Sequence, residues 1–274
     1  MSNGMKIGIS SWACPWQIGV AGYPVLQQPM DWRDLLALAR QEGAQVLQIA
    51  DNLPLNTLPS SEWDALGQGA AAHCITLEVG TRGLQPDRLR TYLRIAQHTQ
   101  AKLVRTLPHD GADRPSQAEA QKRLRAVLPL YEQANIALAI ENHDFYPASW
   151  LRELVGALDS PFVRACLDAV NNLGQGESFR EVLSVLGPVT ASFHCKDYVI
   201  RRKPTQLGFD VEGCPAGEGF LDLKLARQVL PQDCTWVIES WLPWQGDIEA
   251  TCRMERDWVY IGMNNLRAFR DKTL

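Results

Sequence analysis

Four side chains that can bind a divalent cation stand at the ends of four successive strand candidates. They are Glu141, Asp168, His194 and Glu239. Each follows a short and mostly apolar segment, at residues 136–140, 163–167, 190–193 and 235–238. Such a segment is typical of a strand that is buried on both faces. Each segment therefore delivers one hard, metal-competent side chain to the end of a buried strand.

The elements that must position these side chains alternate along the chain. Predicted strands cover residues 6–10, 45–50, 74–79, 102–106, 136–141, 163–168, 189–194 and 235–239. Helical patterns follow them, at residues 31–41, from 61, 86–99, from 116, 150–158, from 178, 222–229 and 247–269. Alternating strands and helices predict a parallel α/β sheet with right-handed crossovers. Eight such units most simply close into a (β/α)8 TIM barrel, here a single domain of residues 1–274. An open doubly wound sheet is the alternative, and it is weakened because residues 8–11 lack the Gly-rich phosphate turn.

Several helix starts are marked by capping residues. The predicted starts are Asp31, Ser61 with Asp64, Pro86, Ser116 with Glu119, and Ser178 with Glu181. Short polar side chains at these places accept hydrogen bonds from the first free amides of a helix, and proline suits its first turn.

The segment 196–219 is predicted to be a long polar loop. It spans about 24 residues, well beyond the roughly 2–6 of a usual connection in such a fold. Loops of this length tend to be functional, so we expect this one to form part of a lid whose truncation harms turnover.

The composition excludes several classes of protein. The chain has 274 residues, 46% of them hydrophobic and 21% charged, as in a globular protein able to bury a core. A net charge of −4 argues against a nucleic-acid partner. The 7 cysteines are scattered and odd in number, which indicates reduced thiols. No apolar stretch approaches a membrane span and no signal peptide precedes the first strand, so we expect a cytoplasmic protein with no membrane partner.

The order of the strand-end motifs resembles the xylose isomerase-like TIM barrels. The motifs are Ile140-Glu-Asn142, Leu167-Asp168, His194-Cys-Lys-Asp197, Gly217-Glu-Gly219 and Ile238-Glu239. This family includes sugar and sugar-phosphate isomerases and epimerases, among them relatives of hydroxypyruvate isomerase, tagatose-3-epimerase and inosose dehydratase. The resemblance covers nearly the whole chain.

The resemblance implies one divalent metal ion held by Glu141, Asp168, His194 and Glu239. Three carboxylates and one imidazole suit Mn²⁺, Mg²⁺, Co²⁺ or Zn²⁺. It further implies that Glu141 and Glu239 are catalytic bases, which move a proton of a hydroxy-ketone or keto sugar acid through an enediolate. The implied activity is a metal-dependent sugar isomerase or epimerase.

The sequence departs from the epimerases at two positions. Asn171 stands where they often carry histidine, and Ile200 stands where they place arginine. The segments 49–54 and 78–83 are closer to the decarboxylases of branched sugar acids, the 3-oxo-isoapionate decarboxylase-like lyases. Decarboxylation of a 3-oxo sugar acid is therefore the alternative reaction, since it uses the same stabilisation of an enolate.

Further strand-end residues are predicted to bind the substrate. They are Trp12, Trp16, Arg82, Arg105, Asn171, Lys196 and Trp241. The cations can hold a carboxylate or phosphate, and the indoles can cover the carbon face of a sugar and exclude water. Two structural alternatives stay open, namely that Arg105 pairs with Glu78 and that Lys196 only pairs with Asp197.

A nuclease and a non-catalytic binding protein are the alternatives to a sugar-converting enzyme. An endonuclease IV-like nuclease would need three metal ions and more than the 5 histidines present. A non-catalytic barrel would be expected to have lost a ligand, and none is missing. The expected partner is thus a small carbohydrate or sugar acid, with a homodimer open beside a monomer.

Overall fold

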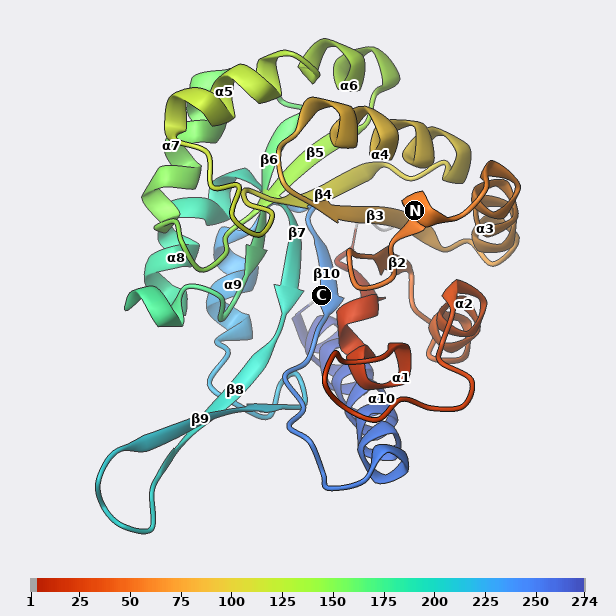
Figure 1. The fold of residues 1–274 in the computed structure, drawn as a ribbon. Helices are drawn as coiled ribbons and strands as arrows, with labels where there is room; N and C mark the ends of the chain where they lie inside the picture. Colours follow the sequence, from red (N-terminus) through yellow and green to blue (C-terminus); the bar gives the residue numbers. More distant parts are fainter. Residues whose placement is uncertain (1–3, 274) are drawn as a thin grey trace.

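A closed barrel of parallel strands forms the centre of the molecule (Figure 1), and the computed structural model describes residues 4–273. Around the barrel the strands follow the order β1-β10-β7-β6-β5-β4-β3-β2, and β2 pairs with β1 to close the ring. The (β/α)8 TIM barrel predicted above is confirmed. The barrel strands are β1 (Lys6–Ser10), β2 (Val46–Ile49), β3 (Thr76–Arg82), β4 (Leu103–Leu107), β5 (Ala137–Glu141), β6 (Val163–Asp168), β7 (Thr190–Cys195) and β10 (Thr235–Ile238).

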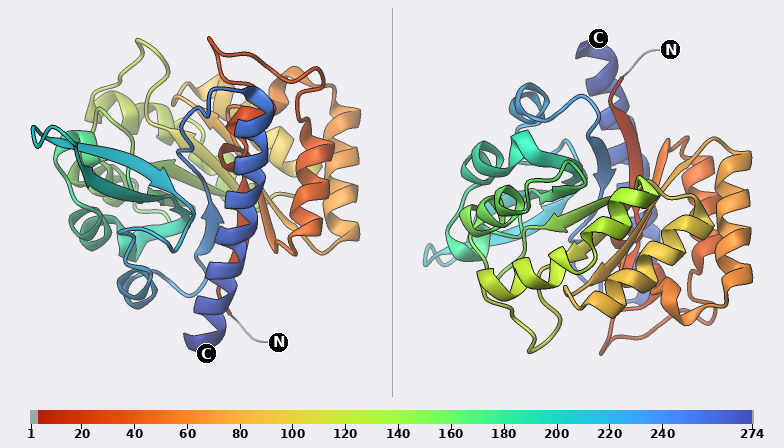
Figure 2. Two further views of the ribbon diagram at one scale, coloured as in Figure 1. Left: turned by 90° about the horizontal axis from the view of Figure 1, so that it is seen from below. Right: turned by 90° about the horizontal axis from the view of Figure 1, so that it is seen from above.

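Helices surround this barrel on the outside. The α-helices are α1 (Pro15–Ile18), α2 (Trp32–Gln41), α3 (Ser60–Ala72), α4 (Pro86–Thr99), α5 (Gln117–Arg125), α6 (Leu128–Ala134), α7 (Ala148–Leu158), α8 (Phe179–Leu186), α9 (Leu223–Val229) and α10 (Ile248–Thr273). Short 3-10 turns lie at η1 (Ser11–Ala13), η2 (Leu55–Thr57), η3 (Leu173–Gln175) and η4 (Gly187–Val189). Both views of Figure 2 show α10 running alongside β1. Within residues 4–273, no helix has the length and apolar character needed to cross a membrane.

Most predicted helix starts are confirmed. Asp31 and Ser178 each form a capping box, Ser116 accepts from the amide of Glu119, and Pro86 opens α4. The predicted start at Ser61 is wrong, because α3 begins at Ser60 after Pro59 and has no side-chain cap. Asp64 instead pairs with Nδ1 of His98 at 2.8 Å.

The space inside the barrel is partly polar. Gln48, Glu78, Ser192 and Thr235 are buried there and hydrogen-bond to one another. Branched apolar residues usually fill the interior of such barrels, so this polar layer is a feature of this chain. Where β1 and β2 approach most closely only glycine fits, since a Cβ at Gly8 would lie 2.1 Å from the carbonyl oxygen of Val46.

The prediction of a loop at 196–219 is wrong in part. The segment contains an antiparallel hairpin, β8 (Asp197–Arg202) and β9 (Phe209–Cys214), which projects away from the barrel (Figures 1 and 2). In the first four residues of β9, apolar Phe209 and Val211 alternate with charged Asp210 and Glu212, a pattern typical of a strand. Leu207 and Phe209, at and beside the tip, are exposed.

Candidate active site

A cavity of about 330 Å³ opens at the carboxyl ends of the barrel strands. All seven residues predicted to bind substrate line it, namely Trp12, Trp16, Arg82, Arg105, Asn171, Lys196 and Trp241. Glu141 and Glu239 line it as well, and so do Asp51, His143 and Ser240, which the sequence analysis did not select. Asp51 directly follows the predicted strand 45–50, so the rule that singled out the other strand ends applied to it too. The binding roles of these residues remain predictions.

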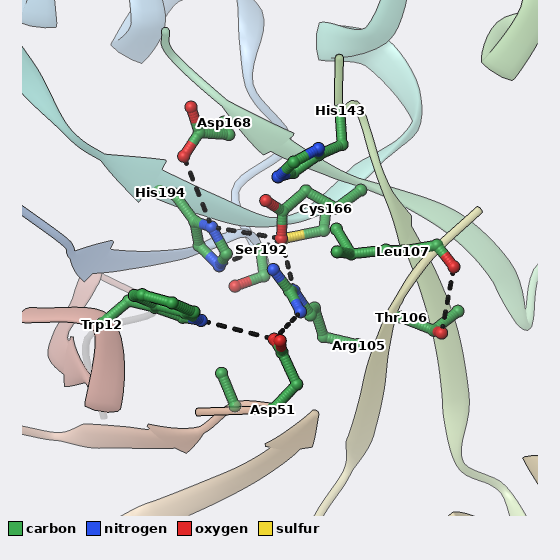
Figure 3. Close-up of polar contacts among 12 residues, drawn as sticks. Trp12, Asp51, Arg105, Thr106, Leu107, His143, Cys166, Asp168, Ser192 and His194 are labelled. Atoms are coloured by element: carbon green, nitrogen blue, oxygen red, sulfur yellow. Dashed lines mark hydrogen bonds and ion pairs between the residues drawn. The ribbon is translucent and has the colours of Figure 1, made fainter. Parts of the chain in front are cut away.

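The four predicted metal ligands meet around one ring nitrogen. Nδ1 of His194 lies 3.3 Å from Glu239 Oε1, 3.4 Å from Glu141 Oε2 and 3.8 Å from Asp168 Oδ2. All four side chains are buried, and within residues 4–273 Nδ1 has no hydrogen-bond partner. Figure 3 shows the imidazole of His194 beside Asp168 and Cys166. A buried nitrogen facing three carboxylate oxygens needs a positive charge, carried either by a proton or by a metal ion.

The pKa of His194 is shifted in the direction that favours a positive charge at this place. Burial acts to lower the pKa of His194, but the combined effect of Cys166, Glu239 and Glu141 outweighs it and raises the pKa well above its usual value. The residues therefore fit a divalent cation, since three carboxylates and an imidazole nitrogen are donors that Mn²⁺, Mg²⁺ and Zn²⁺ accept. The geometric cluster of Asp168, His194 and Glu239 is one of the groups able to hold such an ion.

Lys196 supplies a fixed positive charge at the edge of this cluster. Its Nζ lies 2.8 Å from Asp168 Oδ2 and 2.9 Å from Glu239 Oε2, and the side chain is buried. The contact with Asp168 Oδ2 is an ion pair without hydrogen-bond geometry. Burial works against the ammonium, but Asp168 and Glu239 raise the pKa of Lys196 above its ordinary value. The structural alternative, in which Lys196 pairs only with Asp197, is wrong, because its ion-pair partners are Asp168 and Glu239.

Glu141 is held by two partners of its own. Its Oε2 accepts a hydrogen bond from Nε of Arg105, and its Oε1 accepts one from Nδ2 of Asn171 at 2.9 Å. Arg105 also donates to Asp51 Oδ1 at 2.7 Å. The suggestion that Arg105 pairs with Glu78 is therefore wrong, since Glu78 lies deeper in the barrel and is satisfied by hydroxyl and amide groups.

Arg82 and Trp12 form the rim next to Asp51. Asp51 Oδ2 accepts from Nε of Arg82 at 3.0 Å, and its Oδ1 lies 3.3 Å from the indole nitrogen of Trp12, which Figure 3 shows turned toward this carboxylate. The side chain of Arg82 is 40% exposed, so part of its guanidinium faces the cavity. An anionic group of a substrate can bind there.

The sequence matches the family model described as xylose isomerase-like TIM barrel over residues 36–258. The chain belongs to the xylose isomerase-like TIM barrel family. The match covers all strands of the barrel except β1, and the resemblance stated from the strand-end motifs is thereby confirmed.

Three known proteins illustrate the similarity. The chain is 33% identical over 265 residues to a 3-oxo-isoapionate decarboxylase of Pectobacterium atrosepticum, covering 96% of this chain and 95% of that protein. The structure of a D-psicose 3-epimerase with D-tagatose from Clostridium cellulolyticum H10 superposes with a TM-score of 0.70 at 14% identity, covering 97% and 99% of the two chains. The IOLI protein with a bound zinc atom superposes with a TM-score of 0.68 at 15% identity, covering 98% and 99%. The two structures support the fold alone.

Proposed function

We propose that this protein is a divalent-metal-dependent decarboxylase that acts on a 3-oxo sugar acid. The chain is 33% identical to a 3-oxo-isoapionate decarboxylase over 96% of its length. The alternative reaction of the sequence analysis thus takes precedence over the isomerase or epimerase.

One observation at the site carries this choice, namely that both candidate bases are tied to cationic groups. Glu141 accepts from Arg105, and Glu239 Oε2 lies 2.9 Å from Nζ of Lys196. Burial raises the pKa of Glu239, but His194 and Lys196 together lower it below its ordinary value. A base that abstracts a C–H proton needs the opposite adjustment. Decarboxylation abstracts no such proton.

The residues would hold the ion and the substrate in distinct parts of the cavity. Glu141, Asp168, His194 and Glu239 would bind the metal, which when bound supplies a Lewis acid for the oxo group of the substrate. Arg82 binds an anionic group of the substrate at the rim. Trp12, Trp16 and Trp241 exclude water and so weaken the solvation of the departing carboxylate.

The reaction breaks the bond between the carboxylate carbon and its neighbour. The electron pair of that bond moves toward the oxo group and gives an enolate, while CO₂ leaves. Lys196 stabilises the negative charge that develops on the oxygen. The carbon that carried the carboxylate then takes one proton from solvent, which balances the reaction and leaves a ketose.

The test follows CO₂ and deuterium together. The protein is chelated, reloaded with Mn²⁺, and incubated in D₂O with a 3-oxo sugar acid. We expect CO₂ release that depends on the added metal, with one deuterium in each ketose and none exchanged into the remaining substrate. Exchange or isomer formation without CO₂ would contradict the proposal.

An isomerase or epimerase remains the second candidate. Glu141 and Glu239 face the same cavity, so a substrate lying between them could be deprotonated by one and reprotonated by the other. The D₂O experiment separates the two reactions.

A further inference from the structure

The imidazole of His194 is held from inside the barrel by a chain of buried polar side chains. Its Nε2 lies 2.9 Å from Oε1 of Gln48, and Nε2 of Gln48 donates to Oε2 of Glu78 at 2.8 Å. His194 and Gln48 are wholly inaccessible to solvent, and Glu78 is 2% exposed. The chain therefore connects the candidate metal centre with the polar layer in the middle of the barrel.

The direction of each hydrogen bond in this chain is fixed by Glu78. Its Oε2 also accepts from the hydroxyl of Ser192 at 2.9 Å, and its Oε1 accepts from that of Thr235 at 2.6 Å. A carboxylate only accepts hydrogen bonds, so Gln48 must turn its NH₂ group toward Glu78 and its carbonyl oxygen toward His194. The ring nitrogen that faces this oxygen must carry a hydrogen.

A second neighbour of this ring nitrogen agrees with the same assignment. Sγ of Cys166 lies 3.2 Å from Nε2 of His194, and sulfur is a weak acceptor for an N–H group. Both neighbours of Nε2 can therefore accept its hydrogen, while Nδ1 is left without a hydrogen-bond partner among the described residues.

We infer that Glu78, acting through Gln48, is a positioning residue that fixes His194 with its hydrogen on Nε2 and its Nδ1 lone pair facing the three carboxylates. The inference rests on the proposed function, because it takes His194 as a metal ligand. A ligating histidine whose other nitrogen donates to a fixed acceptor binds metal more strongly, since ring orientation and tautomer are set in advance. Gln48 and Glu78, two members of the polar layer, thus set the orientation of a proposed metal ligand before the ion binds.

The first variant is Glu78→Gln. An amide at position 78 can present either an oxygen or an NH₂ group, so Gln48 is free to turn its own NH₂ group toward His194. We expect the affinity for Mn²⁺, measured by titration calorimetry, to fall by about 10–100-fold.

A double variant tests the direction of the hydrogen bonds. Gln48→Glu with Glu78→Gln places an obligatory acceptor beside His194 and an amide donor behind it. We expect this exchange to restore Mn²⁺ affinity to about the wild-type value, because the hydrogen returns to Nε2. If Glu78 had only a structural role, moving its carboxylate to position 48 would not restore the Mn²⁺ affinity.

Thr235→Val is the matched control. It removes one donor to Glu78 on the Oε1 side and leaves the contact between Gln48 and Glu78 intact. We expect a change in the urea midpoint of the metal-free protein with unchanged Mn²⁺ affinity. In the Zn²⁺-loaded proteins, the ¹⁵N signals of the His194 ring should match the wild type in the control and the double variant, and differ in Glu78→Gln.

The outcomes separate this inference from the proposed function. If the wild type binds no divalent ion, the proposed function fails. If the wild type binds Mn²⁺ and releases CO₂ but Glu78→Gln binds it equally well, only the positioning role is overturned. If Glu78→Gln does not fold, the double variant decides, because a folded double variant with lost Mn²⁺ affinity overturns the inference.

Discussion

At the scale of single residues, Lys196 contacts the same two carboxylates that a metal ion would use. Its Nζ lies 2.8 Å from Asp168 and 2.9 Å from Glu239. Lys196→Met should lower kcat by about 10²–10³-fold, the usual loss when a group that stabilises an oxyanion is removed. Mn²⁺ affinity should rise, because a competing cation has gone. Kinetics and calorimetry on this variant check both effects, with Lys203→Met on the hairpin as control. A fall in Mn²⁺ affinity would show that Lys196 supports the metal site instead.

A buried carboxylate on the outer helix gives a pH-dependent contribution to stability. Glu255 accepts hydrogen bonds from the amides of Trp16 and Gln17 at 2.8 and 3.1 Å, and so holds α1 against α10. Burial raises its pKa from 4.5 to about 7, against the lowering effect of these hydrogen bonds. Because the folded value is the higher one, the contribution is complete below pH 4.5 and is lost as the pH rises through 7.

Glu255 should make the free energy of unfolding fall as the pH rises. Between pH 4.5 and 8, the wild type should lose about 3 kcal/mol in free energy of unfolding through Glu255 alone. Urea unfolding of Glu255→Gln over this range should lack that loss, whereas Glu249→Gln, exposed on the same helix, should keep it. Equal slopes for the wild type and Glu255→Gln would refute the assignment.

The four proposed metal ligands could be selected from sequence because each stands at or directly after the end of a predicted strand, whereas the residues that support them could not. Glu141, Asp168 and His194 are recognisable from position alone, since the carboxyl ends of parallel strands meet. Gln48 and Glu78 interrupt apolar strands, and only the closed barrel shows that they lie next to each other. The sequence shows which residues of one strand share a face, but it does not show which residues of other strands they contact across the barrel interior.

At the scale of elements, the base of the hairpin depends on one carboxylate. Asp197 accepts hydrogen bonds from the amides of Tyr198 at 2.8 Å and of Gly217, Gly219 and Leu221 at 2.9 Å. Asp197→Asn places an NH₂ group against some of these donors and should reduce the free energy of unfolding by about 1–3 kcal/mol. Urea unfolding checks this, with Asp210→Asn on the exposed hairpin face expected to stay within about 0.5 kcal/mol of wild type.

The hairpin of β8 and β9 is the element that the sequence did not predict, because the segment 196–219 was expected to be a loop. The barrel strands are continuous apolar runs, which are readily recognised, but β8 and β9 mix apolar with charged residues and lie among glycines. The alternation Phe209-Asp-Val-Glu212 was a signal for a strand. Of the segment 196–219, Lys196 alone among the described residues lines the cavity, and the lid role of the segment stays a prediction.

At the scale of the whole molecule, metal binding should couple to the stability of the barrel. The ligands come from β5, β6 and β7 and from the residue after β10, so one ion would connect four strands. Saturation at 100 times the Kd adds about 2.7 kcal/mol to the free energy of unfolding. The Tm should therefore rise with Mn²⁺ concentration and fall on chelation, and Asp168→Asn should remove the dependence. A wild-type Tm that does not respond to Mn²⁺ would contradict the metal site.

The projecting hairpin offers a site at which the chain can be cut, because β8 and β9 form a sheet separate from the barrel. Its turn has Gln206 and Gly208 at positive φ of 63° and 109° and is exposed to solvent. A cut there would leave three of the proposed ligands on the longer fragment and Glu239 on the shorter one. Fragments 1–206 and 207–274 should assemble through the pairing of β10 with β1 and β7. Each alone would lack a complete centre, so Mn²⁺-dependent turnover on mixing would report fragment complementation.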